Sequence, residues 1–307
     1  MKENCKSEEN AMFTQSIHYI TPAVTPLLPD GSLDYASCEK LYRHLVRGGV
    51  DGILILGSIG EFFAFPMEEQ KKLIPFARKV VGDSAELIVG TSSMIFDEMV
   101  ALSNYALDQG ADAVMLLPPY YFHFTGDTLV EYYRELAQAI HGNVYLYNFP
   151  DRTGYEIPVE TARILAETCP NIIGIKDSVG GMDHTRELIK AIRPIRSDFR
   201  IYSGFDDHFV HNILCGGNGC IGGLSNLFPE LTTAWKQAMK AGDWEQVRAI
   251  QNQVDKLMDI YSVGKPFVPI IKEAMAMQGY IAHPTATKPM PKATQEQKEK
   301  LKAILKL

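Results

Sequence analysis

Eight short runs of apolar, mostly β-branched residues recur along this chain, and longer amphipathic segments separate them. Strands that are apolar almost throughout are typical of parallel sheets buried on both faces, and parallel strands need long crossover connections. Eight strand–helix units therefore predict an α/β protein with a (β/α)₈ TIM barrel, whereas six or fewer would favour an open, doubly wound sheet. The runs lie at residues 16–24, 51–57, 86–91, 112–119, 143–148, 171–177, 200–204 and 219–223.

The segments between these runs carry apolar residues at helical spacing and usually end in glycine. Examples are residues 34–49, 65–82 and 126–142. The repeating units end near residue 240, and further helical patterns follow them. We therefore expect a catalytic barrel over residues 12–240 and a small helical C-terminal extension over residues 241–307, which is not a separate catalytic domain.

Composition limits the partners and the compartment. The net charge of −7 disfavours nucleic acid and anionic membranes, because both attract basic surfaces. The polar start and the lack of an apolar run of about 18 residues predict neither a signal peptide nor a membrane span. The cysteines lack CxxC spacing, which indicates reduced thiols in a cytoplasmic protein and argues against zinc. They are Cys5, Cys38, Cys169, Cys215 and Cys220.

The carboxyl ends of the predicted strands carry most of the unusual residues. In such barrels catalytic groups gather at that rim, where the loops after the strands begin. The second run ends in GSIGEF (57–62), the fifth in YNFPDRTG (147–154), the sixth in Lys176 and the eighth in GGNGCIGG (216–223). Hydroxyl, carboxyl, guanidinium and amine groups thus converge on one end of the barrel.

Lys176 stands near the end of the apolar run NIIGIKD (171–177). Isoleucine neighbours would desolvate its amine, which disfavours the ammonium form and leaves the neutral amine free to attack a carbonyl carbon. The alternative is a strand-end lysine that reaches solvent and pairs with Asp177. The chemistry at the other strand ends favours a nucleophile that forms a Schiff base.

These four stretches together resemble the dihydrodipicolinate synthase and N-acetylneuraminate lyase superfamily of pyruvate-dependent class I aldolases. GSIGEF is similar to its G-[ST]-x-G-E motif, YNFPDRTG to its tyrosine motif, GIKD to its Schiff-base lysine strand, and GGNGCIGG to its glycine-rich eighth-strand turn. The resemblance covers essentially the whole chain in consistent order and spacing. It implies imine chemistry that uses no metal and no organic cofactor.

The resemblance also implies roles for individual residues. Lys176 would form the imine with the keto carbon of pyruvate or of a 2-keto acid. Tyr147 would be the proton shuttle, in relay with Ser58 and Tyr121, because a tyrosine alone is a weak base. Tyr121 would reach into the active site of a neighbouring subunit. This implies a homodimer, usually assembled as a dimer of dimers into a homotetramer.

The resemblance places the pyruvate carboxylate on the backbone amides of Ser58 and Ile59, as turns that lead into helices commonly bind anions. Many members have a second hydroxyl residue where this chain has Ile59, so one hydroxyl contact to the carboxylate is missing. Glu61 is interpreted as a structural residue that caps the helix after the turn.

The residues expected around the second substrate favour different substrates. Arg152 matches an arginine of dihydrodipicolinate synthases; it would bind a carboxylate or, alternatively, hold its loop by pairing with Asp151. Asp206 and Asp207 resemble the polyol-binding segment of N-acetylneuraminate lyases and 2-keto-3-deoxygluconate aldolases, and Asp206 as a helix cap is the competing interpretation. The other expected substrate contacts are Ser178, Ile221 and Gly222, and Gly222 and Gly223 would leave space for a longer chain.

We therefore predict a class I aldolase, a carbon–carbon lyase that cleaves a 2-keto-3-deoxy sugar acid to pyruvate and an aldehyde or forms it from them. The alternative is 4-hydroxy-tetrahydrodipicolinate (dihydrodipicolinate) synthase, which condenses pyruvate with aspartate semialdehyde. N-acetylneuraminate lyase or a related dehydratase is a further alternative. A non-catalytic barrel that binds a keto acid is disfavoured because Lys176 and Tyr147 are both present.

Overall fold

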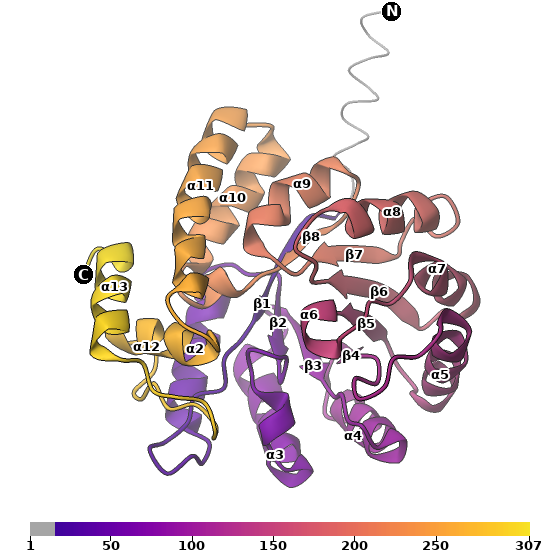
Figure 1. Cartoon of the computed structure of the whole chain (residues 1–307), viewed down its shortest axis with the longest axis horizontal. Coiled ribbons are helices and arrows are strands. Elements are labelled where there is room, and N and C mark those ends of the chain that lie inside the picture. The colour runs from indigo at the N-terminus through magenta and orange to yellow at the C-terminus, as the bar shows by residue number, and fades with distance from the viewer. Residues whose placement is uncertain (1–15) are drawn as a thin grey trace, which may run out of the picture.

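The computed structural model describes residues 16–307, which form a closed barrel of eight parallel strands surrounded by helices (Figure 1). The strands are β1 (His18–Pro22), β2 (Gly52–Ile55), β3 (Glu86–Gly90), β4 (Ala113–Leu116), β5 (Val144–Asn148), β6 (Ile172–Asp177), β7 (Arg200–Ser203) and β8 (Gly219–Ile221). Each strand pairs in parallel with the next, and β1 closes the barrel against β8. The predicted (β/α)₈ barrel is confirmed, and each predicted run contains one strand.

Helices follow the strands and cover the outside of the barrel (Figure 1). The expected helices correspond to α2, α3 and α5; Asp34 begins α2 by accepting a hydrogen bond from the Ser37 amide, and Gly82 follows α3. The helices are α2 (Tyr35–Arg47), α3 (Met67–Val81), α4 (Phe96–Asp108), α5 (Gly126–Ala139), α6 (Pro150–Thr153), α7 (Val159–Thr168), α8 (Asp183–Ile192), α9 (Phe209–Leu214) and α10 (Pro229–Ala241). Short 3₁₀ turns are η1 (Phe62–Ala64), η2 (Asp206–His208) and η3 (Gly223–Asn226).

The C-terminal part of the chain forms α11 (Trp244–Leu257), η4 (Met258–Ser262), α12 (Val268–Met277) and α13 (Gln295–Leu305). Helix α11 packs against α10 and against η2, and α12 packs against η4 and α13. Because η2 follows β7, the extension reaches the rim where the strands end. No helix among residues 16–307 is long and apolar enough to cross a membrane.

Three sequence predictions fall outside the described range: the polar chain start, Cys5, and residues 12–15 of the expected barrel domain. The other four cysteines, at positions 38, 169, 215 and 220, are free thiols, as the lack of paired spacing predicted. The division of the chain at residues 240 and 241 stays a prediction, since the extension packs directly on the barrel helix α10.

Large and small residues alternate around the inside of the barrel. Tyr145 of β5 and Tyr202 of β7 lie across the interior with a distance of 6.1 Å between ring centroids. Gly174 lies on β6, between these strands, and a Cβ atom there would be 2.7 Å from the Tyr145 ring and 2.4 Å from the Arg200 carbonyl oxygen. The glycine within NIIGIKD is therefore required because neighbouring tyrosines fill the barrel at its level.

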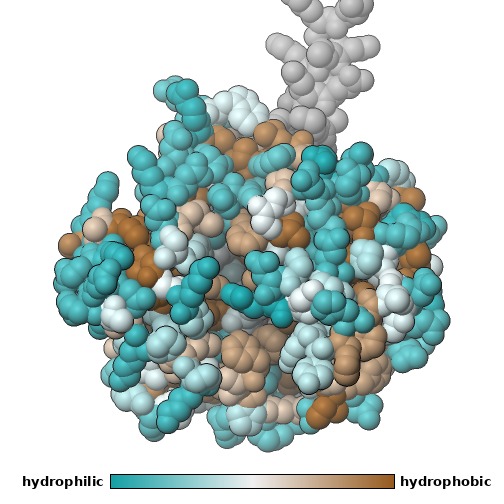
Figure 2. Space-filling model, in the orientation of Figure 1, coloured by the Kyte–Doolittle hydropathy of each residue, from teal (hydrophilic) through white to brown (hydrophobic). Residues whose placement is uncertain are grey.

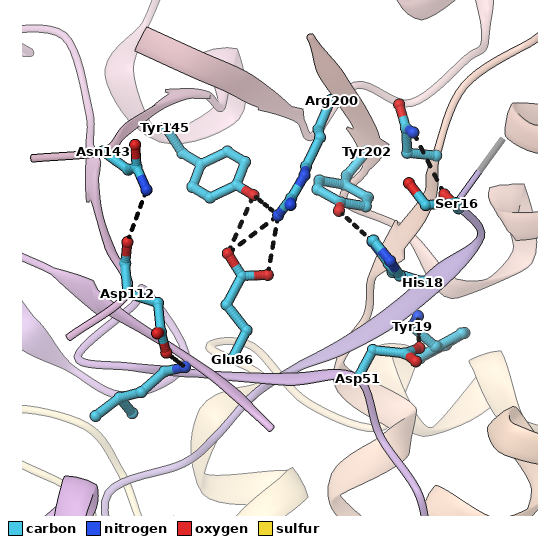
Figure 3. A network of polar contacts seen from close by, with 12 residues as sticks. Ser16, His18, Tyr19, Asp51, Glu86, Asp112, Asn143, Tyr145, Arg200 and Tyr202 are labelled. Atoms are coloured by element: carbon cyan, nitrogen blue, oxygen red, sulfur yellow. Dashed lines mark hydrogen bonds and ion pairs between the residues drawn. The ribbon is translucent and has the colours of Figure 1, made fainter. Parts of the chain in front are cut away.

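A polar network closes the amino-terminal end of the barrel (Figure 3). Arg200 donates hydrogen bonds to both carboxylate oxygens of Glu86, at 3.2 and 3.1 Å, and to the Tyr145 hydroxyl oxygen at 2.8 Å. Burial lowers the pKa of His18, whose Nδ1 forms a 2.8 Å hydrogen bond with the Tyr202 hydroxyl. These groups satisfy one another, so this end of the barrel is structural and the opposite rim is left for chemistry.

The close packing around Gly174 predicts the effect of adding one methyl group inside the barrel. Gly174→Ala is expected to lower the apparent free energy of unfolding by about 2–3 kcal/mol, because the new Cβ overpacks Tyr145. Gly180→Ala is the matched control, since its Cβ would meet no atom within 4 Å. Chemical denaturation followed by circular dichroism measures both, and equal midpoints for the two variants would contradict the account.

Candidate active site

The carboxyl ends of β5 and β6 bring Tyr147 and Lys176 together. The two residues are register partners in this parallel strand pair, and the Lys176 Nζ atom lies 4.6 Å from the centroid of the Tyr147 ring. Only 5% of Lys176 and 4% of Tyr147 are exposed. A desolvated amine therefore lies against the side chain that is predicted to be the proton shuttle.

A cavity of about 200 Å³ opens over this pair. Ser58, in the loop after β2, lines it and places its Oγ atom 3.4 Å from the Tyr147 hydroxyl oxygen. Ile59, Arg152, Ser178 and Asp206 line the same cavity. The structure thus brings the predicted lysine and the hydroxyl pair to one site together with most of the predicted substrate contacts.

The loop after β2 has a left-handed residue at each end, with φ of 53° at Leu56 and 61° at Glu61. Glu61 does not cap η1 as the sequence predicted, because its side chain is fully buried and forms an ion pair with Lys272 of α12. Its second carboxylate oxygen accepts hydrogen bonds of 2.7 Å from both the amide and the hydroxyl of Thr287. The C-terminal extension therefore fixes the loop that presents the Ser58 amide.

Asp206 lines the cavity with a carboxylate that is already fully hydrogen-bonded. Its Oδ1 accepts from the Tyr19 hydroxyl at 2.5 Å and the Leu224 amide at 3.0 Å; its Oδ2 accepts from the Gly223 amide at 3.1 Å and the Tyr261 hydroxyl at 3.2 Å. Burial raises the pKa of Asp206, and these donors oppose that shift. The carboxylate fixes the turn after β8 and caps neither η2 nor α9. A sugar hydroxyl would have to displace one of these donors.

The remaining residues predicted for the second substrate lie behind the cavity wall or beside it. Asp207 and Ile221 are outside the set that lines the cavity, and Ile221 is fully buried in β8. A Cβ on Gly222 would lie 2.3 Å from Asp206 Oδ1 and 2.7 Å from the Tyr19 hydroxyl. The space that Gly222 leaves is therefore occupied by protein, which corrects the expectation of room for a longer substrate.

Arg152 is exposed, and its guanidinium lies 5.3 Å from the centroid of the Phe149 ring. Within residues 16–307 it forms no ion pair, so the alternative of a loop held by pairing with Asp151 is not what the structure shows. Its side chain borders a second cavity of about 640 Å³, which Lys265 and Met290 of the extension also line. Arg152 therefore has free donors beside both cavities.

The sequence patterns missed what the C-terminal extension adds to the site. Met258, Tyr261 and Phe267 line the cavity, and a Cβ on Gly223 would lie 2.4 Å from the Tyr261 hydroxyl. Burial and the charge of Asp206 raise the pKa of Tyr261 well above its usual range, so it remains a donor. These residues follow the repeating units and have no motif spacing; the glycine at 223 is the one local sign of a close neighbour.

Tyr121 lies away from the cavity of its own chain. It follows β4, is 80% exposed, and contacts Phe122 edge-to-face at 5.1 Å between ring centroids. The loops after β2, β3 and β4 expose further large apolar side chains, and Figure 2 shows apolar side chains gathering in the lower half of this face. We call this set the aromatic patch: Phe63, Met94, Ile95, Tyr121, Phe122 and Phe124. An apolar surface of this kind is typical of a protein–protein contact.

The buried ion pair at the loop yields a stability prediction. Lys272→Met leaves the Glu61 carboxylate buried without its cation, and we expect the apparent free energy of unfolding to fall by about 3–5 kcal/mol. The control is Lys300→Met, which removes a 2.8 Å pair with Glu296 between side chains that are 57% and 78% exposed. That loss should be about 1 kcal/mol or less. Similar losses in chemical denaturation of both variants would show that the buried pair does not hold the loop.

Known proteins are similar to this chain in sequence and in architecture. Residues 15–307 match the model described as the dihydrodipicolinate synthetase family. The Escherichia coli protein named "Probable 2-dehydro-3-deoxy-D-pentonate aldolase YjhH" is 32% identical over 286 residues, which cover 93% of this chain and 95% of that protein. A 4-hydroxy-tetrahydrodipicolinate synthase of Kosmotoga olearia is 33% identical over 282 residues, covering 92% and 95% respectively.

A third relative adds a solved structure. The Escherichia coli protein YagE, provisionally named a 2-dehydro-3-deoxy-D-gluconate aldolase, is 32% identical over 300 residues, or 97% of each chain. Its crystal structure in complex with pyruvate matches this fold with a TM-score of 0.91 at 30% identity, covering 95% of this chain and 98% of that one. Proteins named as sugar-acid aldolases and as synthases thus match nearly the whole chain.

Proposed function

The chain belongs to the dihydrodipicolinate synthetase family, and from this premise we propose that it is a Schiff-base aldolase that cleaves or forms 2-keto-3-deoxy sugar acids. The observation that carries the proposal is the buried Lys176 amine at a strand end, 4.6 Å from the Tyr147 ring centroid. Relatives named as aldolases of 2-dehydro-3-deoxy sugar acids support the substrate class. The enzyme is accordingly a carbon–carbon lyase.

In the proposed reaction the neutral Lys176 amine attacks the C2 carbonyl of the substrate, and loss of water leaves a protonated imine. Tyr147, relayed through Ser58, takes the C4 hydroxyl proton while the C3–C4 bond breaks and its electron pair enters the imine. The aldehyde leaves, and Tyr147 returns the proton that it took to C3 of the enamine. Hydrolysis then releases pyruvate and restores the amine. The imine is the electron sink, so this scheme needs no metal and no organic cofactor.

The substrate carboxylate is assigned to the amides of Ser58 and Ile59, in the loop that Glu61 anchors. Ser178 supports a substrate whose second half carries hydroxyl groups. This residue is 3% exposed and lines the cavity, and its Oγ forms no hydrogen bond within residues 16–307. A hydroxyl at the cavity surface that no protein group binds is available to a ligand that provides a partner.

Arg152 favours the second candidate, 4-hydroxy-tetrahydrodipicolinate synthase. Its free guanidinium beside the cavity suits the carboxylate of aspartate semialdehyde. Asp206 supports neither reaction as a direct contact while its carboxylate binds four protein donors. The two candidates therefore differ in which of Ser178 and Arg152 meets the second substrate.

The aromatic patch is the surface that we assign to the dimer, with Tyr121 entering the partner's cavity and two dimers forming a tetramer. Tyr121 is exposed in the single chain. It can join a hydroxyl relay only when a neighbouring subunit brings its Tyr147 close to it. We assign the protein to the cytoplasm, where its free thiols stay reduced.

The proposed function is tested by two assays run in parallel on the purified protein. We expect pyruvate release from 2-keto-3-deoxygluconate or its pentonate analogue, and no condensation of pyruvate with aspartate semialdehyde. Lys176→Ala should abolish turnover, and Tyr147→Phe should lower kcat by about 100-fold or more because proton transfer is lost. Condensation without release would transfer the assignment to the synthase; an active Lys176→Ala enzyme would exclude the imine mechanism.

Complementation tests the role of Tyr121 across the dimer. Lys176→Ala and Tyr121→Phe chains carrying different tags are co-expressed, and the mixed dimer is purified through both tags. One of its two sites then combines an intact Lys176 with the partner's intact Tyr121, so activity should return to about half of the wild-type value. If the mixed dimer is no more active than the Tyr121→Phe homodimer, Tyr121 does not act in the partner's site.

A further inference from the structure

The side chains directly behind the catalytic pair belong to a closed hydrogen-bonded ring. Asn148 and Asp177 follow Tyr147 and Lys176 in the sequence and are register partners across β5 and β6. Successive residues of a strand point to opposite faces, so these two side chains lie on the outside of the barrel. There the side-chain amide of Asn148 donates a 2.7 Å hydrogen bond from Nδ2 to Asp177 Oδ1, and both residues are at most 1% exposed.

His184, near the start of α8, completes this ring. Its Nδ1 lies 3.0 and 3.1 Å from the two carboxylate oxygens of Asp177, and its Nε2 lies 3.0 Å from the Ile157 carbonyl oxygen. The Ile157 amide donates a 2.8 Å hydrogen bond back to Asn148 Oδ1. Four residues on β5, β6, α8 and the segment before α7 are thus joined in one circuit.

The partners of His184 determine its charge. A carboxylate and a carbonyl oxygen can only accept, so both ring nitrogens must donate, which requires the imidazolium form. Burial disfavours this charge, but the hydrogen bond and the charge of Asp177, with a further contribution from Glu156, raise the pKa of His184 above its usual range. The His184 side chain is 11% exposed and that of Asp177 0%. A nearly buried imidazolium–carboxylate pair therefore lies behind the catalytic lysine.

We propose that His184 is a positioning residue whose protonated ring holds Tyr147 and Lys176 in register from outside the barrel. Its charge also balances Asp177, so that the residue next to Lys176 adds no net negative charge. An unbalanced carboxylate at that place would favour the ammonium form of Lys176, which cannot attack a keto carbon. The kinetic consequence rests on the proposed imine function, whereas the charge of His184 does not.

The effect of pH has a defined sign. The folded-state pKa of His184 is raised, so its ion pair contributes stability that is fully present below about pH 6.5, the usual unfolded value. That stability is lost as the pH rises through the folded-state pKa. The ring of hydrogen bonds then loses a donor, and Asp177 is left unbalanced. Loss of the His184 proton, which lies outside the cavity, would therefore weaken imine formation at alkaline pH.

Nitrogen-15 NMR of the intact protein tests the charge directly. The signals lost in His184→Gln identify its ring, and both of its nitrogens are expected to be protonated at about pH 7.5, above the usual histidine range. The signals lost in His141→Gln provide the reference for a histidine that pairs with a carboxylate on the surface. His141 lies 3.0 Å from Asp108, and the two side chains are 54% and 65% exposed. A neutral His184 ring at that pH would overturn the proposal whether or not the protein is an aldolase.

The kinetic consequence is tested by borohydride trapping of pyruvate on Lys176 across pH. In His184→Gln the midpoint of trapping should move upward by about one pH unit, because Asp177 is unbalanced. Thr185→Val, which removes an uncharged 2.6 Å donor from the same carboxylate, should leave the midpoint unchanged. Unchanged midpoints in both variants would overturn the positioning role. No trapping in the wild type would instead refute the imine function and leave the NMR result standing.

Discussion

The burial of one amine is the constraint on which the rest of this structure depends. Lys176 lies at the end of β6 and is 5% exposed, against the face of Tyr147. The lysine is thus held out of bulk water, and it lines the cavity that a keto acid would enter. Its sequence neighbour Asp177 points away and is balanced by His184, which keeps the inner face of the barrel free of a competing carboxylate.

The barrel alone does not build the site. The loop that presents Ser58 is fixed by the Glu61–Lys272 pair, and the turn after β8 is fixed by Asp206 with the Tyr261 hydroxyl among its donors. In both places the C-terminal extension supplies the partner. A charged group buried between the barrel and its extension couples their stability, so these helices are part of the active site's support as well as a cover for the barrel.

The sequence predicted what local patterns encode. Short apolar runs located all eight strands, and the residues at their carboxyl ends, together with the family resemblance, indicated Lys176 and Tyr147, because parallel strands bring those ends to one rim. Contacts between distant segments leave no spacing to detect. The sequence therefore predicts a helix cap at Glu61, where the structure has an ion pair with Lys272. It also predicts room for substrate at Gly222, where the structure has Asp206 and Tyr19. Tyr121 is a different case, since its proposed target lies in another chain.

A crystal of this protein soaked with pyruvate tests the central claim most directly. The account predicts continuous electron density from the Lys176 Nζ atom to C2 of pyruvate, with the carboxylate at the amides of Ser58 and Ile59. Pyruvate bound without that covalent link, or linked to another lysine such as Lys265 beside the second cavity, would contradict it.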